Sequence, residues 1–342
     1  MEYQQFVIPN FRLQRGAILP QAVVAYKTYG ALSATRDNVI LYPSWYGAQH
    51  PDLEWAIGEN RILDPTRYFI VVVNQFGNGL SSSPSTLGEA FRSRSPPVFT
   101  HVDNVEAQRQ LLADVFGITR LALVYGWSMG GQQALHWGAL HPECVARICA
   151  LCTSAKTSPH NRVFLEGLRA TLHADGAWRD GTFDAHPTRA VKAFARVYAG
   201  WALSQAFYRE LVWAQHGYES LEDFLVRGWE QRFLRRDPRD LLSMLDTWLA
   251  SDISDNDRYH GDLTRALGAI TARTLVMPAS TDLYFTVEDS RRESALMPHA
   301  ELRVIASIWG HRAGNPWQCP DDETAIRCAL RTLLACGDRD TP

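Results

Sequence analysis

The residues best suited to chemistry surround Ser128, in the string Gly126-Trp127-Ser128-Met129-Gly130. This is the G-x-S-x-G pattern of a nucleophile elbow, in which a serine stands on a sharp turn between a strand and a helix. An apolar run of strand length, 121–125, precedes the string, and residues 132–137 after it have a helix-compatible composition. Gly126 and Gly130 supply small residues where such a strained turn crowds its own backbone. We predict that Ser128 is an activated nucleophile; the alternative is a glycine-rich turn with an incidental serine, which needs no acid or base downstream.

A serine nucleophile needs a histidine base and an orienting carboxylate, and after an elbow of this kind they follow in the order Ser, Asp, His. The predicted strand 274–279 is followed by Asp282, and the predicted strand 301–305 is followed by His311. Because parallel strands carry their chemistry at their carboxyl ends, both side chains are expected at the same edge as Ser128. The sequence therefore predicts a triad of Ser128, Asp282 and His311.

Other acids and histidines are weaker candidates for the same roles. Asp289 stands in a helix-like stretch, and Asp255 lies in a helical block. His136 falls inside the helix after the elbow, and His299 precedes the last predicted strand. We expect each of these four to be a surface or packing residue.

The tetrahedral intermediate formed by such a serine carries a negative oxygen, which pre-placed hydrogen-bond donors must stabilise. One donor is the backbone N–H of the residue after the nucleophile, here Met129. The second comes from the loop after the third strand, here 43–47, where we choose the amide of Trp45. The alternative is a plain loop with a surface aromatic residue.

A mostly parallel sheet is needed to position these residues, and the first 151 residues have its pattern. Strand-like runs at 23–29, 38–42, 68–74, 121–125 and 145–151 are interrupted by helical patterns such as 102–116. The run 68–74 is continuously apolar, as in strands that are covered on both faces. We predict an α/β fold whose central sheet is mostly parallel and is covered by helices on both faces.

A different pattern begins near residue 157. From there to residue 267 no strand signal is present, and the chain has amphipathic segments rich in Arg, Trp and Ala. Strands resume at 274–279, and a helix is predicted at 321–335. A helical block inserted between strands of one sheet is typical of a lid over an active site. We predict a core formed by residues 1–156 and 268–342 and a lid formed by residues 157–267.

The composition narrows the classes of partner. The chain has 342 residues, of which 46% are hydrophobic and 21% charged, as in ordinary globular proteins. Its formal net charge of −3 argues against a nucleic-acid or anionic-membrane partner, since either favours a basic face. No secretory signal begins the chain, and no run reaches the ~18 apolar residues of a membrane helix. We expect a cytoplasmic protein that binds a small molecule.

The cysteines indicate no cofactor. Cys149 and Cys152 form a C-x-x-C string, but it lies in an apolar run and has no second metal pair. Buried reduced thiols are therefore expected. We predict that the chemistry uses neither a metal nor an organic cofactor.

Several sequence motifs between Tyr26 and His311 are shared with a known family. They are Tyr26-Lys27-Thr28-Tyr29-Gly30, Asp64-Pro65-Thr66-Arg67-Tyr68-Phe69, Asn74-x-x-Gly77 with its Ser/Pro-rich turn, Ser128–Leu135 and Asp282-Leu283-Tyr284. Together they resemble the homoserine O-acetyltransferase-like branch of the α/β-hydrolases. The resemblance implies the α/β-hydrolase fold, the triad named above, a helical lid and a homodimer built on lid helices.

That branch holds both acyl-CoA-dependent transferases and plain esterases, and this chain departs from the transferases. The transferases have a His-Asp pair whose Asp helps to hold homoserine's ammonium, whereas this chain has His311-Arg312, and a cation there would repel an ammonium. Trp127 replaces a small residue and would narrow the acyl or alcohol pocket. Residues 45–47 are Trp-Tyr-Gly, whereas the transferases have Leu-Thr-Gly. A sequence similar to Trp-Tyr-Gly occurs in short-chain esterases resembling ethyl acetate hydrolase.

A lid arginine of the transferases, which meets homoserine's carboxylate, corresponds by resemblance to Arg196. The alternative for Arg196 is a solvated arginine on a helix face. The substrate-binding residues predicted from the resemblance are thus Trp127, Arg196 and Arg312.

The sequence as a whole predicts a serine carboxylesterase that cleaves short-chain, chiefly acetyl, esters. The first alternative is a homoserine O-acetyltransferase, which shares every step until the second nucleophile arrives, so the triad cannot separate the two. Arg312 favours hydrolysis. A further alternative is a non-catalytic binding or scaffold member of the fold, which has no need of a complete Ser/Asp/His set.

Overall fold

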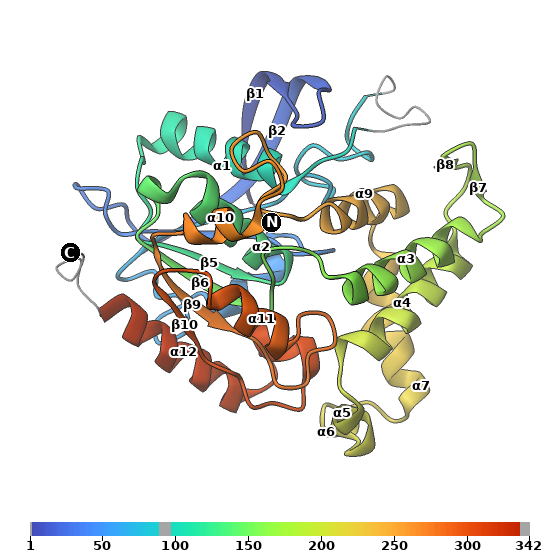
Figure 1. Cartoon of the computed structure of the whole chain (residues 1–342). Coiled ribbons are helices and arrows are strands. Elements are labelled where there is room, and N and C mark those ends of the chain that lie inside the picture. Colours follow the sequence, from blue (N-terminus) through green and yellow to red (C-terminus); the bar gives the residue numbers. More distant parts are fainter. Residues whose placement is uncertain (1, 89–96, 336–342) are drawn as a thin grey trace.

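The computed structural model describes residues 2–88 and 97–335, and its centre is a sheet of eight strands (Figure 1). The strands are β1 (Gln4–Arg12), β2 (Ile18–Tyr29), β3 (Val39–Pro43), β4 (Phe69–Val73), β5 (Leu123–Trp127), β6 (Arg147–Leu151), β9 (Arg273–Met277) and β10 (Ala300–Leu302). Their order in the sheet is β1-β2-β4-β3-β5-β6-β9-β10. The six strands from β4 to β10 are parallel to one another, while β1 and β2 pair antiparallel, which confirms the predicted mostly parallel sheet.

Helices cover both faces of the sheet, as predicted. Alternate side chains of β3 enter two separate apolar cores, with Ile40 and Tyr42 in one and Val39 and Leu41 in the other. The core containing Val39 is completed by α1 (His101–Phe116), α2 (Met129–Leu140) and α10 (Leu263–Gly268). The core containing Ile40 is completed by α12 (Pro320–Ala335) and by helices between residues 159 and 249.

The helices between residues 159 and 249 gather on the right of Figure 1. They are α3 (Pro159–His173), α4 (Thr188–Ala202), α5 (Gln205–Arg209), α6 (Val212–Gln215), α7 (Leu221–Asp223), the π-helix η5 (Phe224–Glu230), α8 (Gln231–Leu234) and α9 (Pro238–Leu249). This is the block for which the sequence predicts a lid. The expectation that it contains no strand is wrong, because β7 (Trp178–Arg179) and β8 (Thr182–Phe183) form a short hairpin. Asp180 and Gly181 turn it with positive φ angles of 51° and 84°, the geometry for which an Asp-Gly pair is suited.

Two further differences concern the edges of the sheet. The predicted strand 23–29 is the second part of β2, which begins at Ile18 and pairs with β1, a strand that the sequence analysis did not identify. At the other edge, the predicted strand 301–305 is reduced to Ala300–Leu302, followed by an isolated bridge between Ala279 and Ile305. The predicted helix at 321–335 is confirmed as α12.

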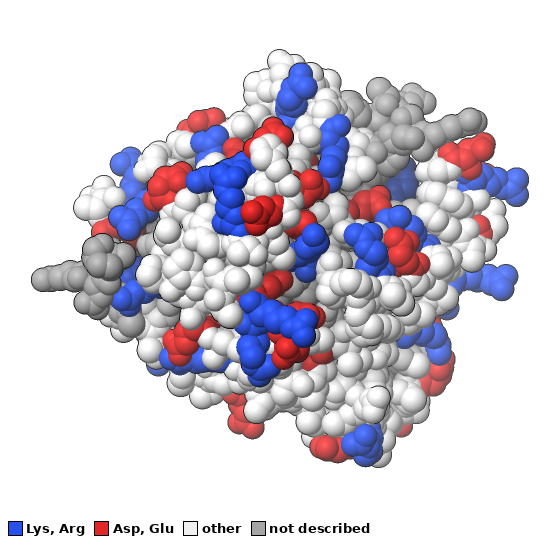
Figure 2. All heavy atoms as spheres, in the orientation of Figure 1, with Lys and Arg blue, Asp and Glu red and all other residues white. Residues whose placement is uncertain are grey.

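The surface carries mixed charges. On the face shown in Figure 2, basic and acidic side chains are interspersed, in keeping with the net charge of −3. Within the described ranges, no helix combines the length and the apolar character that crossing a membrane requires.

The predicted state of the C-x-x-C string is confirmed, because Cys149 and Cys152 are buried free thiols. Cys144 and Cys319 are partly exposed and Cys328 is exposed, while Cys336 lies outside the described residues.

The turn between β5 and α2 is strained and tightly packed. Ser128 has a φ of 57° and a ψ of −127°, a backbone conformation that side-chain-bearing residues rarely adopt. A Cβ on Gly126 would lie 2.2 Å from the carbonyl oxygen of Gly130, and one on Gly130 would lie 2.6 Å from that of Pro43. Only glycine therefore fits at these two positions, as the elbow pattern predicts.

Buried histidines join α2 to α1. His136 Nδ1 donates to the carbonyl oxygen of Gln132 at 2.8 Å, and His101 Nε2 lies 3.1 Å from Gln132 Oε1. The two imidazole rings are 5.1 Å apart and both residues are buried. Because burial disfavours the imidazolium form, the pKa of His136 falls from 6.5 to about 4, and that of His101 is also lowered.

We expect Gly126→Ala to lower the free energy of unfolding by about 3 kcal/mol or more, because the added methyl overlaps backbone that cannot move away. Gly167→Ala is the matched control, since a Cβ at this exposed position of α3 meets no atom within 4 Å. It should stabilise the protein by about 0.5–1 kcal/mol, through the higher helix propensity of alanine. Urea denaturation of both variants measures the difference, and equal stabilities would contradict the packing described for the turn.

The buried histidines predict acid sensitivity. Between pH 6.5 and 4 the unfolded chain takes up a proton at residue 136 that the fold excludes, so stability is lost as the pH falls through this window. His136→Gln should reduce that loss by about 3 kcal/mol at pH 4. The exposed His299→Gln is the control and should leave the profile unchanged. Unfolding free energies measured across this pH range test the prediction. If the free energy of His136→Gln fell with pH as steeply as that of the unsubstituted protein, the prediction would be contradicted.

Candidate active site

The elbow holds Ser128 at the carboxyl end of β5, where it is buried. Its carbonyl oxygen accepts hydrogen bonds from the Gln132 N–H at 2.9 Å and from Thr153 Oγ1 at 2.8 Å. Thr153 also fills the space beside Gly131, where a Cβ would lie 2.7 Å from the threonine Cβ. Sequence reasoning missed Thr153. A signal was available, because Thr153 lies just after the carboxyl end of β6, as Ser128 does after β5, and the two strand ends lie at the same edge of the sheet.

Asp282 and His311 form a buried pair. His311 Nδ1 lies 2.8 Å from Asp282 Oδ2, and the other carboxylate oxygen accepts from the amides of Tyr284 at 2.8 Å and Phe285 at 3.3 Å. Since the carboxylate accepts, Nδ1 is the donor, and in the neutral imidazole this leaves Nε2 with its lone pair. Among the described residues, Nε2 is buried without any hydrogen-bond partner. This is the arrangement of a base that is ready to accept a proton.

Aromatic packing joins this pair to the elbow. The imidazole of His311 stacks on the indole of Trp127 with ring centres 4.8 Å apart and planes at 28°, and the Trp127 Nε1–H donates to the His311 carbonyl oxygen at 3.0 Å. Tyr284 packs its ring edge-on against the same imidazole at 4.7 Å. Because Trp127 directly precedes Ser128, these contacts bring the predicted base and acid to the serine's own turn.

The two amides predicted to meet an oxyanion lie on adjoining segments. Trp45 is buried, which excludes the alternative of a surface aromatic residue. Within the described part of the chain, neither the Trp45 N–H nor the Met129 N–H, in the first turn of α2, has an acceptor. Gln133 Nε2 links the segments by donating to the carbonyl oxygens of Ser44 at 3.0 Å and Met129 at 3.3 Å. The sequence contained Gln133 as a family mark, but its linking role depends on contacts that only the fold brings together.

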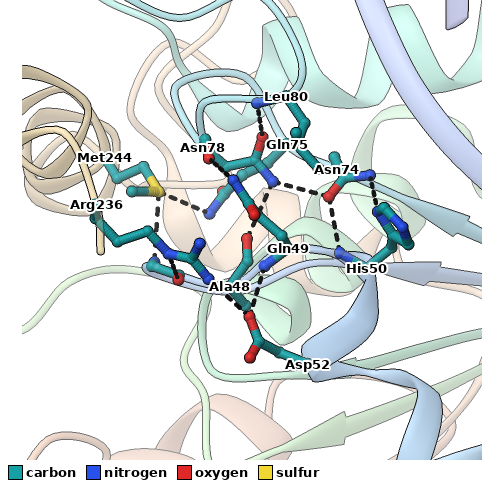
Figure 3. A network of polar contacts seen from close by, with 11 residues as sticks. Ala48, Gln49, His50, Asp52, Asn74, Gln75, Asn78, Leu80, Arg236 and Met244 are labelled. Atoms are coloured by element: carbon teal, nitrogen blue, oxygen red, sulfur yellow. Dashed lines mark hydrogen bonds and ion pairs between the residues drawn. The ribbon is translucent and has the colours of Figure 1, made fainter. Parts of the chain in front are cut away.

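A polar network fixes the loop that begins with Ser44 (Figure 3). Asn74 Oδ1 accepts from the His50 N–H at 2.9 Å and from Asn78 Nδ2 at 3.0 Å, and the Asn78 amide also donates to the Ala48 carbonyl at 3.0 Å. From the helical block, Arg236 donates to the Gly47 carbonyl oxygen at 2.8 Å. The loop is therefore held both by the end of β4 and by the segment between α8 and α9.

The predicted substrate-binding residues lie in different surroundings. Trp127 packs against His311 and, with ring centres 4.8 Å apart, against Trp45. Arg312 follows His311 and lies over the ring of Trp317, 5.5 Å from its centre.

The guanidinium group of Arg196 forms ion pairs with acidic side chains of the helical block. Its Nε donates to Glu230 at 2.6 Å and its Nη1 to Glu222 at 2.9 Å, and these carboxylates raise its pKa. Since these donors are already taken, the geometry does not support the predicted contact of Arg196 with a substrate carboxylate.

The competing candidates have structural roles elsewhere. Asp289 accepts from the Thr286 hydroxyl at 2.8 Å and helps to cap α11 (Val287–Ser294), while Asp255 pairs with Arg15 at the surface at 2.6 Å. His136 is the packing histidine of α2, and His299 is exposed. In the described part of the chain, none of these residues makes a hydrogen bond with His311 or Asp282.

One set of side chains has the composition of a metal site, since ligand atoms of Cys152, Asp282 and His311 lie within 4.8 Å of one another. The Asp282 carboxylate already accepts three hydrogen bonds, and burial raises the pKa of the Cys152 thiol, which opposes the thiolate that a metal requires. The set therefore fits a histidine–carboxylate pair better than a metal centre.

Comparison with known proteins finds relatives that cover most of the chain. The profile of the alpha/beta hydrolase fold family matches residues 37–313. The chain is 39% identical to ethyl acetate hydrolase of Pseudomonas veronii, over 87% of this chain and 86% of that protein. It is 31% identical to homoserine O-acetyltransferase of Chlorobaculum parvum, over 89% and 87% respectively. The solved structure of an acetylester hydrolase from Corynebacterium glutamicum superposes with a TM-score of 0.93 and 34% identity, covering 97% of this chain and 96% of that one.

Proposed function

The chain belongs to the alpha/beta hydrolase family, and we propose that within it the protein is a carboxylesterase that cleaves short-chain, chiefly acetyl, esters. The observation that carries the proposal is the buried His311–Asp282 pair packed on the elbow, in which Nε2 of the histidine has no hydrogen-bond partner among the described residues. The names of the similar proteins, an ethyl acetate hydrolase and an acetylester hydrolase, support the same class of reaction.

In the proposed reaction, the Ser128 hydroxyl oxygen attacks the ester carbonyl carbon while its proton passes to His311 Nε2. Asp282 holds the ring in this orientation and stabilises the imidazolium. The carbonyl oxygen becomes an oxyanion, which the amides of Trp45 and Met129 stabilise. The carbon–oxygen bond to the alcohol then breaks, and the alcohol leaves with the proton from His311. Water, activated by the same histidine, releases the acid from the acyl-enzyme.

Two buried tryptophan side chains favour substrates with a small acyl group. Trp45 and Trp127 pack edge to face at 4.8 Å and both are buried, and we infer that these two rings limit the size of the acyl group beside the elbow. The stack of Trp127 on the imidazole also favours the charged ring that forms during attack, because an aromatic face attracts a cation.

The alternative is acyl transfer from acetyl-CoA to homoserine, supported by the likeness to homoserine O-acetyltransferase. Arg312 argues against it, because its cation directly follows the base and would repel the ammonium of the acceptor. The lid function of residues 157–267 and a homodimer built on its helices remain predictions.

We expect Ser128→Ala and Asp282→Asn each to lower kcat for p-nitrophenyl acetate by about a thousandfold or more, the first through loss of the nucleophile and the second through a misoriented imidazole. Asp289→Asn is the matched control and should keep kcat within about threefold, since Asp289 caps a helix. Near-normal turnover by Asp282→Asn would remove Asp282 from the triad, and substantial turnover by Ser128→Ala would remove the serine.

The class of reaction is tested by offering the purified protein ethyl acetate or p-nitrophenyl acetate, and then acetyl-CoA with homoserine, and by following free acetate and free CoA. We expect rapid release of acetate from the esters, falling as the acyl chain lengthens past butyryl, and negligible CoA release that depends on homoserine. The opposite pattern, homoserine-dependent release of CoA with little ester turnover, would establish the transferase instead.

A further inference from the structure

A pocket of about 470 Å³ lies beside the proposed catalytic residues and is rich in arginine. One wall comes from the loop after β3 and includes Trp45, and the other comes from η5 and α8. Arg227, Arg232 and Arg235 line it from the helical block, and Arg312 lines it from the loop that carries His311. Four cations from two separate parts of the chain therefore surround one cavity.

Most of this charge has no counterion in the part of the chain that the structure describes. Arg227 is paired with Asp223, and Asp52, the acidic residue in the lining, pairs with Arg236 at 2.9 Å. In the described part of the chain, the guanidinium groups of the other three arginines make no ion pair and no hydrogen bond with an acidic side chain. The pocket is thus a region of net positive charge inside a protein whose overall charge is −3.

Among these four arginines, Arg312 is the one whose charge is disfavoured by burial and by a neighbouring cation. It is half-buried, its contact is with the face of Trp317, and burial together with the charge of Arg232 lowers its pKa to about 9. A partly desolvated cation facing other cations is costly unless an anion accompanies it. Guanidinium groups bind carboxylates and phosphates through paired, charge-assisted hydrogen bonds.

A neutral donor also faces the pocket. Asn315 accepts from Trp55 Nε1 at 2.9 Å through Oδ1, which directs its amide nitrogen away from the indole. Among the described residues this nitrogen has no acceptor, so it is a further donor for an anion in the cavity.

The pocket adjoins the proposed reaction centre. Trp45 lies in the wall of the pocket and contributes its amide to the proposed oxyanion site, and Arg312 directly follows the proposed base. A group bound in the pocket would therefore lie close to the ester undergoing attack.

We propose that this pocket binds an anionic group, a carboxylate or a phosphate, carried by the ester on which the enzyme acts. This inference rests on the proposed esterase function. It assigns the arginines to recognition of the substrate's charged end, and it makes a neutral ester such as ethyl acetate a poorer substrate than an anionic ester of similar size.

The test compares kcat/KM for matched pairs of esters. Propyl acetate is paired with 3-acetoxypropanoate and with 2-acetoxyethyl phosphate, and ethyl butanoate is paired with monoethyl succinate. We expect at least one charged ester to exceed its neutral partner by about tenfold or more, mainly through a lower KM, with the advantage shrinking as salt is added. The pairs distinguish a carboxylate from a phosphate and the alcohol side from the acyl side.

Arginine variants assign the effect to the pocket. Arg232→Gln and Arg312→Gln should each reduce the charged-to-neutral ratio by about fivefold or more. Arg189→Gln, an exposed arginine of α4 outside the pocket lining, is the matched control and should leave the ratio unchanged.

Failure of the inference and failure of the proposed function can be told apart. If neutral and charged esters are hydrolysed equally well and inorganic phosphate does not compete, the esterase stands and the anion pocket is overturned. If no ester is hydrolysed, the proposed function fails. Calorimetric titration with inorganic phosphate then tests independently whether the pocket binds an anion. Binding that Arg232→Gln weakens supports the pocket, whereas no binding overturns it.

Discussion

The rest of the structure depends on the close backbone contact at the turn between β5 and α2. Ser128 is held in a conformation that costs of order 1–3 kcal/mol, and the turn persists because its surroundings allow no other path. On one side Gly130 lies against the carbonyl of Pro43 at the end of β3, and on another Gly131 lies against Thr153 after β6. The strands that flank β5 therefore fix the serine, so a local motif is stabilised by the pairing of the whole sheet.

The same contact determines where the other groups can lie. Because Gly130 touches the end of β3, the loop that starts there must pass the elbow, which brings the Trp45 amide next to the turn. Trp127, one residue before the serine, then provides the surface on which the His311 ring stacks. In the loop that carries His311, Gly310 has a φ of 59° and lies so close to the end of α4 that a Cβ would be 2.8 Å from the Ala202 carbonyl oxygen. The helical block is thus packed directly against the loop that carries the proposed base.

The sequence was most informative where function depends on local order. The elbow string and the rule that polar residues follow strand ends are enough to propose Ser128, Asp282 and His311, the last two of which form a hydrogen-bonded pair, since each signal lies within a few residues of the strand that positions it. Contacts between distant segments could not be predicted in this way. The ion pairs that occupy Arg196 come from Glu222 and Glu230, 26 and 34 residues away, and the hydrogen bonds of Gln133 depend on how α2 meets the loop after β3. The hairpin at Asp180-Gly181 is different, because its turn signal is local and is contained in the sequence.

Arg312 connects the proposed chemistry to the proposed selectivity. In a site that must hold an ammonium beside the base, a cation at this position opposes binding, and burial makes the repulsion stronger than it would be in water. The same charge, grouped with Arg232 and Arg235, attracts an anion. In the proposed function, a single residue after the histidine thus has two effects, since it excludes a cationic acceptor and favours an ester with a negatively charged end. Discrimination of this kind uses both attraction and repulsion, and it leaves the serine, the histidine and the aspartate free to carry out a reaction that would be the same for either partner.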